Sequence, residues 1–222
     1  MDIKANLEAI KKTFTNPHCQ LIAVSKTKPL SDLKEAYAAG IRDFGENKVQ
    51  ELQTKHPEMP DDVRWHMIGH LQSNKVKYIA PFVHLIHGVD SFKLLREINK
   101  QGKKAGRVLS VLLQVHIAQE ETKFGFDKNE LDGMFADPDF LQLSHVRIQG
   151  LMGMATFTDN SEQVRREFKT LKNLFDEIKN RHLPEFVQME DISMGMSGDY
   201  LIAQEEGSTM VRIGSAIFGG RN

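Results

Sequence analysis

The sequence predicts an α/β fold, a single closed (β/α)8 barrel of the TIM type with an extra helix at the N-terminus. Short apolar runs alternate with amphipathic segments along the whole chain, and strict alternation of strand and helix is typical of a parallel sheet. Eight such repeats within 222 residues favour a closed barrel over an open sheet.

The predicted strands are the short runs rich in Val, Leu, Ile and Phe. They cover residues 21–24, 41–44, 63–68, 82–86, 108–117, 146–152, 191–194 and 209–213. The predicted helices between them cover residues 31–40, 49–55, 74–79, 92–104, 129–135, 161–181 and 199–206, and a helix over residues 6–14 precedes the first strand. We expect Ser31 to cap the first of these seven helices, and Gly40 and Gly207 to follow helix ends.

Length and composition set limits on the class of protein. We expect residues 1–222 to form one domain, because barrels of about 200–250 residues are single domains. A net charge of −1 argues against a dedicated nucleic-acid binder. Cys19 is the only cysteine, so no intramolecular disulfide forms, which fits a reducing compartment. No apolar run reaches the ~20 residues of a membrane span, and we expect a cytoplasmic protein that binds no membrane.

Lys26 is the first candidate for chemistry, because active groups of α/β barrels lie at the carboxyl ends of strands. Counting by two from Ile22 and Val24 places Lys26 on the same face of the first strand. If that face points into the barrel, loss of hydration favours a neutral amine, which is what condensation with an aldehyde requires. Lys28 is the neighbouring candidate, although Pro29 biases it towards an extended loop. The alternative is that both lysines are solvated charges at a strand end.

Two segments near the C-terminus are candidates for binding a phosphate. Ser197, Gly198 and Asp199 open a predicted helix, whose first N–H groups and partial positive charge suit an anion. Gly214 and Ser215 follow the last predicted strand, and barrels often bind phosphate in the loops after strands seven and eight. The alternative is that the serine only caps a helix and the glycines only make turns.

Metal and nucleotide chemistry find little support. His66 and His70 are four residues apart, but they lie on no convincing helix and lack an acidic partner, so we expect no metal site. Neither Gly-x-Gly-x-x-Gly nor a P-loop occurs. Met-Gly-Met ends two neighbouring predicted strands, at residues 152–154 and 194–196, which suits either packing or an adaptable wall around a flat ring.

Several motifs together resemble a known family over residues 20–221. They are AVSKTKP at 23–29, FGEN at 44–47, WHMIG at 65–69 with LQSNK at 71–75, SMGMS at 193–197 and VRIGSAIFG at 211–219. In this order they are similar to the pyridoxal 5′-phosphate (PLP) homeostasis proteins, also called the alanine racemase N-terminal-domain-like or proline-synthase co-transcribed family. Two positions depart from the family pattern near the predicted rim: Lys48, where Tyr is common, and His116, where Asn is frequent.

The resemblance implies a PLP-bearing barrel in which Lys26 carries the cofactor as a Schiff base. It implies that Arg212 faces the pyridine nitrogen and that residues 197 and 214–215 contact the phosphate. The full set of expected cofactor-binding residues is therefore Lys26, Asn47, His66, Met194, Gly195, Ser197, Arg212, Gly214 and Ser215.

We expect a carrier rather than an enzyme. Arginine is always charged and only donates, so Arg212 would leave the ring nitrogen unprotonated and the electron sink weak. Related racemases add a β-rich domain with a tyrosine base, for which 222 residues leave no room. We therefore predict a monomer or weak homodimer that stores or delivers PLP, with PLP-dependent apoenzymes as partners. A weak amino-acid racemase is the second hypothesis, and a PLP-free aldolase that uses Lys26 is the third.

Overall fold

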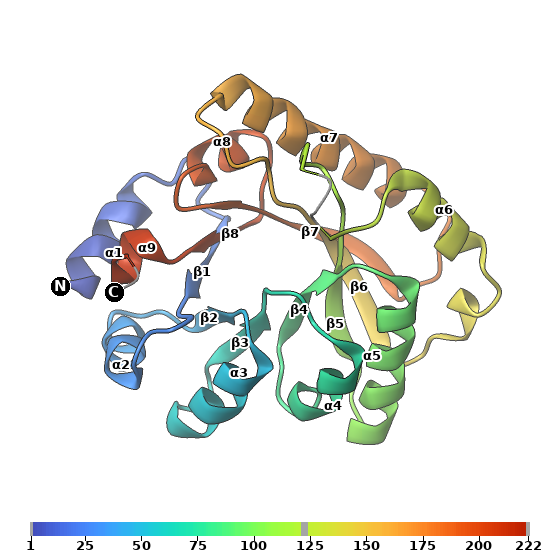
Figure 1. The fold of residues 1–222 in the computed structure, drawn as a ribbon, viewed down its shortest axis with the longest axis horizontal. Coiled ribbons are helices and arrows are strands. Elements are labelled where there is room, and N and C mark those ends of the chain that lie inside the picture. The colour runs from blue at the N-terminus through green and yellow to red at the C-terminus, as the bar shows by residue number, and fades with distance from the viewer. Residues whose placement is uncertain (1, 121–123, 221–222) are drawn as a thin grey trace.

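Parallel strands close into a barrel in the computed structural model, which describes residues 2–120 and 124–220 (Figure 1). The strands are β1 (Gln20–Val24), β2 (Asp43–Glu46), β3 (Arg64–Met67), β4 (Leu85–Val89), β5 (Leu109–Gln114), β6 (Val146–Met152), β7 (Val187–Met196) and β8 (Met210–Ile213). Each strand pairs with its neighbours in chain order, and β8 pairs with β1 to close the ring. The structure therefore confirms the predicted barrel.

Helices surround the ring of strands (Figure 1). They are α1 (Ile3–Lys12), α2 (Leu30–Ala38), α3 (Val49–Lys55), α4 (Val76–Ile79), α5 (Phe92–Ala105), α6 (Lys128–Ala136), α7 (Ser161–Lys179), α8 (Tyr200–Glu205) and α9 (Ser215–Phe218), with 3-10 turns η1 (His56–Glu58), η2 (Ser73–Lys75) and η3 (Phe140–Gln142). The extra helix α1 precedes β1, as predicted. It lies beside α9, where Asn6 Nδ2 donates to the Ile217 carbonyl oxygen at 2.9 Å. No described helix is both long and apolar enough to cross a membrane.

Local sequence signals explain where several helices begin or end. Ser91 accepts a hydrogen bond from the Leu94 N–H at the start of α5, which satisfies a main-chain donor that the helix leaves unpaired. Gly40 and Gly207 follow α2 and α8 with φ of +94° and +93°, as predicted. The prediction for Ser31 is wrong: α2 already begins at Leu30, directly after a proline, so this serine lies inside the helix.

The strand boundaries differ from prediction wherever polar residues enter the sheet. β2 extends to Glu46 and β4 to Val89, each beyond its apolar run, and β7 has 10 residues rather than four. Asp43, Glu46 and His87 lie within these strands, and each is buried with hydrogen-bond partners. The search for apolar runs stopped before Glu46 and His87, so it shifted or shortened the predicted strands.

The core has two layers because strand side chains alternate between the two faces of the sheet. The larger layer lies between strands and helices, and α7 contributes a buried face made of Val164, Phe168, Leu171, Phe175 and Ile178. The smaller layer fills the barrel interior and consists of Ile22, Leu85, Leu112, Met152 and Met210. Inward-pointing positions above this interior layer are the ones that can reach a ligand.

Candidate functional site

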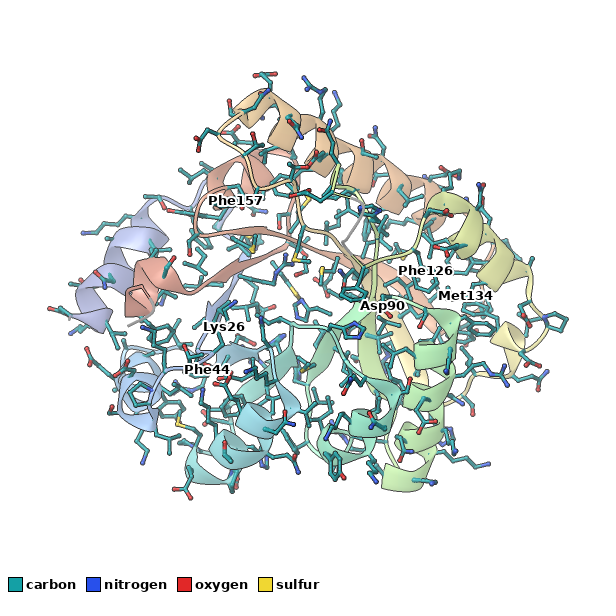
Figure 2. All side chains as sticks on the ribbon, viewed as in Figure 1. Lys26, Phe44, Asp90, Phe126, Met134 and Phe157 are labelled. Atoms are coloured by element: carbon teal, nitrogen blue, oxygen red, sulfur yellow. The ribbon has the colours of Figure 1, made fainter. Side chains whose placement is uncertain are left out.

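A cavity of about 570 Å³ lies at the carboxyl-terminal ends of the strands. Its volume is in the usual range for small-molecule sites. The predicted residues that line it are Lys26, Asn47, Ser197, Arg212, Gly214 and Ser215. Figure 2 shows Lys26, Asp90 and Phe157 around the central opening of the ring of strands. The structure therefore brings six predicted residues, far apart in the sequence, to one cavity.

Lys26 lies two residues beyond β1, and its side chain is half-buried. Ile22 belongs to the interior layer and Val24 lines the cavity, so the alternation along β1 continues to Lys26. Lys28 also lines the cavity, but its Nζ donates to the carbonyl oxygens of Phe218 at 2.8 Å and Gly220 at 3.0 Å. The two lysines thus have different surroundings, and Lys28 ties the β1 loop to the end of the chain.

A buried ionic cluster stabilises the turn that carries Lys26, which we call the cavity lysine. Lys55 Nζ donates to the Ser25 carbonyl oxygen at 2.9 Å, to Glu46 Oε1 at 2.8 Å and to Glu51 Oε2 at 2.8 Å. Ser25 Oγ donates to Glu46 Oε1 at 2.6 Å, and the Thr27 N–H donates to Glu51 Oε2 at 2.7 Å. The residues on both sides of the lysine are therefore fastened to β2 and α3.

Two carboxyl groups share one ammonium in this cluster. Glu46 is fully buried, and burial raises its pKa to about 7 although Lys55 and Ser25 lower it. Burial would also raise the pKa of Glu51, but hydrogen bonds from Lys55 and Thr27 bring it below its usual value. A proton taken up near neutral pH therefore goes to Glu46, directly beneath the lysine turn.

The same turn contains a strained residue. Thr27 has a φ of +63°, a left-handed conformation that is unfavourable for a β-branched side chain. Its N–H is the group that Glu51 accepts from, so the ionic cluster stabilises the conformation. The cavity lysine therefore projects from a turn whose shape is imposed by its neighbours.

Arg212 lies in β8 with a side chain that is almost completely buried, yet its guanidinium lines the cavity. Nη1 donates to the main-chain oxygen of Ser193 at 2.8 Å and to its Oγ at 2.5 Å, and Nη2 donates to the Gly153 carbonyl oxygen at 3.0 Å. Burial lowers the pKa of Arg212 to about 10, partly offset by Asp199, so the group remains charged at neutral pH. Neutral oxygens thus hold a permanent cation at the cavity.

The loops after β7 and β8 meet at one side of the cavity. Ser197 Oγ accepts from the Gly214 N–H at 3.3 Å. A Cβ at Gly214 would lie 3.0 Å from the Val24 carbonyl oxygen, so the glycine lets this loop approach β1 closely. The helices that follow are short, with six residues in α8 and four in α9, so the helix dipole expected from the sequence contributes little. These loops offer an anion the hydroxyl and main-chain N–H groups of Ser197 and Ser215.

Three predicted residues lie away from the cavity lining. His66 is fully buried inside the barrel, where its ring contacts Asp43 and His87. Met194 is buried in the layer between strands and helices. Gly195 has a φ of +96°, and a Cβ there would lie 2.6 Å from a side-chain carbon of α8, so it allows α8 to pack on β7. As direct contacts of a cofactor, these three residues stay predictions.

The two departures from the family pattern also lie outside the lining. Lys48 is exposed at the start of α3. His116 Nε2 lies 2.9 Å from the Glu120 main-chain oxygen, which places the ring against its own loop. Neither side chain changes the walls of the cavity.

Sequence reasoning missed several lining residues. Gln114 ends β5 two positions after Leu112 of the interior layer, so counting by two would have found it. His70 lines the mouth, with Nδ1 3.0 Å from Asp90 Oδ2 and its ring stacked on Phe124 at 4.2 Å between centroids. These contacts join separate loops, so no local sequence pattern predicts them.

Comparison with known proteins agrees with this geometry. The family model described as "Alanine racemase, N-terminal domain" matches residues 1–222. The pyridoxal phosphate homeostasis protein of Aquifex aeolicus (strain VF5) is 41% identical over 216 residues, which cover 96% of this chain and 92% of that protein. The structure of PipY from Synechococcus elongatus PCC7942 with PLP bound superimposes with a TM-score of 0.88 at 34% identity, over 98% of this chain and 100% of that one.

Alanine racemases share the fold at greater distance. The enzyme from Bartonella henselae has a TM-score of 0.72 at 16% identity, and the match covers 99% of this chain but 58% of that one. The fold and the cavity thus define a barrel of the alanine racemase N-terminal type. Within that class, the chain belongs to the family of the pyridoxal phosphate homeostasis proteins, which confirms the resemblance of its motifs.

Proposed function

We propose that this protein binds PLP covalently through the amine of Lys26 and serves intracellular PLP homeostasis by storing and delivering the cofactor. One observation carries the proposal: a single cavity holds an amine, a buried guanidinium and two hydroxyl-bearing loops. The names of the relatives and the PLP in the PipY structure support it. We propose further that residues 1–222 act as one domain, in the cytoplasm, with PLP-dependent apoenzymes as recipients.

The residues of the cavity fit PLP group by group. PLP supplies an aldehyde that reacts with amines and a ring that withdraws electrons. Lys26 offers the amine, the loops after β7 and β8 offer donors for a phosphate, and Arg212 offers a donor for a ring nitrogen. Val24, Ile68 and Met154 line the same cavity and provide apolar walls for a flat ring.

The charge on Arg212 favours storage over catalysis. A guanidinium that stays protonated can only donate a hydrogen bond, so a ring nitrogen that accepts from it carries no proton of its own. An unprotonated ring withdraws electrons less strongly. This supports a carrier whose bound cofactor has weak catalytic power.

The proposal is tested by spectroscopy of the purified protein. We expect PLP to give a visible absorption band that collapses on borohydride reduction, and mass mapping to place the reduced adduct on Lys26. Lys26→Ala should abolish the band. Lys28→Ala is the matched control and should retain it, because that amine is held by carbonyl oxygens of residues 218 and 220. A protein that takes up no PLP would refute the proposal.

A weak amino-acid racemase is the second candidate. The observation in its favour is His70, an imidazole at the cavity mouth whose Nδ1 is held by Asp90, which is the arrangement of an oriented acid–base group. Loss of deuterium from an α-deuterated amino acid at enzyme-like rates, abolished in His70→Gln, would favour this candidate over the carrier.

A further inference from the structure

A continuous chain of hydrogen bonds crosses the barrel interior and ends at Arg212. Arg64 binds Asp43 through Nε at 2.7 Å and Nη2 at 2.5 Å. Asp43 Oδ1 lies 3.0 Å from His66 Nε2, and His66 Nδ1 lies 3.0 Å from His87 Nε2. His87 Nδ1 lies 2.8 Å from the oxygen of the serine that accepts from Arg212.

The side chains that lead from Asp43 to Arg212 are withdrawn from water, whereas Arg64 at the outer end is exposed. His66, His87 and Ser193 have no exposed surface, and Asp43 and Arg212 are 6% and 4% exposed. They cross an interior that is otherwise filled by Ile, Leu and Met side chains. Buried polar groups must be hydrogen-bonded to be tolerated. Each donor in this hydrogen-bonded chain therefore needs an acceptor, and each acceptor needs a donor.

This requirement fixes where the hydrogens lie. Burial would raise the pKa of Asp43, but hydrogen bonds from Arg64 and His66 hold it well below its usual range, so the carboxylate is charged and only accepts. His66 Nε2 must therefore carry a hydrogen. With this ring neutral, its Nδ1 accepts from His87 Nε2, and His87 Nδ1 then accepts from Ser193 Oγ.

The reverse arrangement is disfavoured by charge. It requires a charged His66, yet Asp43 is already neutralised by Arg64 through two hydrogen bonds. A second cation would then share the single Asp43 carboxylate with Arg64 in a closed interior, which is costly. Ser193 would also accept twice, from His87 and from Arg212, and would need a further acceptor for its own hydrogen.

We infer that the two histidines form a one-way relay whose hydrogens all point away from Arg212, and that this relay positions Arg212 for a ligand in the cavity. Because the Ser193 hydrogen is committed to His87, the hydroxyl presents only lone pairs to the guanidinium. Three of the five N–H groups of Arg212 donate to Ser193 and Gly153, which sets the direction of the remaining two. His66, His87 and Ser193 are thus positioning residues.

The relay can be tested without any cofactor. In cofactor-free protein with ¹⁵N-labelled histidine, NMR at pH 8 should show His66 and His87 with a hydrogen on Nε2 and none on Nδ1. The signals are assigned with His66→Gln and His87→Gln. Either ring with its hydrogen on Nδ1 would overturn the relay.

The positioning role rests on the proposed PLP function and is tested by binding. Ser193→Ala should weaken PLP binding about tenfold, because a hydrogen bond to a charged group is lost, and should leave the His87 hydrogen on Nε2, because His66 Nδ1 still requires a donor. Ser208→Ala is the matched control: this serine is equally buried, donates only to main-chain oxygens and lies outside the relay. It should bind PLP within about twofold of wild type.

A pair of variants at one position separates hydrogen bonding from packing. His87→Gln keeps one donor and one acceptor, whereas His87→Leu keeps neither, so only the glutamine variant should retain PLP affinity. Equal affinities in the two variants, or wild-type affinity in Ser193→Ala, would overturn the positioning role. Wild-type protein that binds no PLP would instead refute the proposed function, and the tautomers of the cofactor-free protein would still decide whether the relay exists.

Discussion

Replacing Lys55 with methionine tests the ionic cluster beneath the cavity lysine. The substitution keeps the length of the side chain but removes the ammonium that donates to Ser25, Glu46 and Glu51. Glu46 then has no cation beside it while its side chain remains fully buried. Because the Glu46 carboxylate can lose its charge by binding a proton, the loss of stability should depend on pH.

The magnitude follows from the pKa of Glu46. Its rise from 4.5 to about 7 corresponds to about 3 kcal/mol between the two protonation states. The native state binds this proton more tightly than the unfolded state, so wild-type stability falls as pH rises from 4.5 and levels off above 7. Without Lys55 the native pKa rises further, so the stability of Lys55→Met should continue to fall above pH 7.

The difference between two pH values is the quantity to measure. At pH 6 Lys55→Met should lose about 1–3 kcal/mol, the worth of the hydrogen bonds alone. At pH 8.5 it should lose about 3–5 kcal/mol, the cost of leaving one charge of a buried pair alone. Urea unfolding, followed by the fluorescence of Trp65, gives the stability at both pH values, because this residue is the only tryptophan and is buried.

A second variant checks the cause. In Lys55→Met combined with Glu46→Gln, the buried charge is absent, so the pH 6 and pH 8.5 losses should agree within about 0.5 kcal/mol. If Lys55→Met alone shows the same loss at both pH values, Glu46 is not the titrating group and the electrostatic account of the cluster fails.

Three further substitutions have definite expected outcomes. Thr27→Gly should raise the free energy of unfolding by about 0.5–1 kcal/mol, because glycine tolerates the φ of +63°; a lower melting temperature would contradict the strain. Gly69→Ala should cost about 2 kcal/mol or more and weaken PLP binding, because its Cβ would lie 2.5 Å from the Asn47 carbonyl oxygen. Gly198→Ala, at the same cavity but with open space around it, is its control and should leave unfolding by urea unchanged. Phe157→Ser should change stability by less than about 0.5 kcal/mol, since this ring is 97% exposed, and a larger loss in thermal unfolding would show that it packs.

The barrel and the cavity lysine could be predicted because both depend on local periodicity. Alternating strands and helices leave a parallel sheet as the favoured arrangement, and the count by two along β1 placed Lys26 correctly. The loops at Ser197 and Ser215 were found for a related reason, since chain order alone fixes which loops follow the last two strands.

The histidine relay could not be predicted, because it depends on contacts between strands. In the sequence, a polar residue that points into the barrel looks the same as one that ends a strand. His66 was therefore assigned to the cavity, although three hydrogen bonds, through His87 and Ser193, separate it from the Arg212 guanidinium. Only the pairing of strands shows which polar residues meet.

The seam between β1 and β8 constrains when the protein can acquire its cofactor. Lys26 is made early in synthesis, but Arg212 and the loop beside it come near the end, and Lys28 must still find the carbonyl oxygens of Phe218 and Gly220. A chain that lacks β8 therefore has Lys26 without Arg212 and without the last loop of the cavity. Under the proposed function, an incomplete chain should hold PLP less tightly than the finished barrel, because the cavity is complete only when the last strand joins the first.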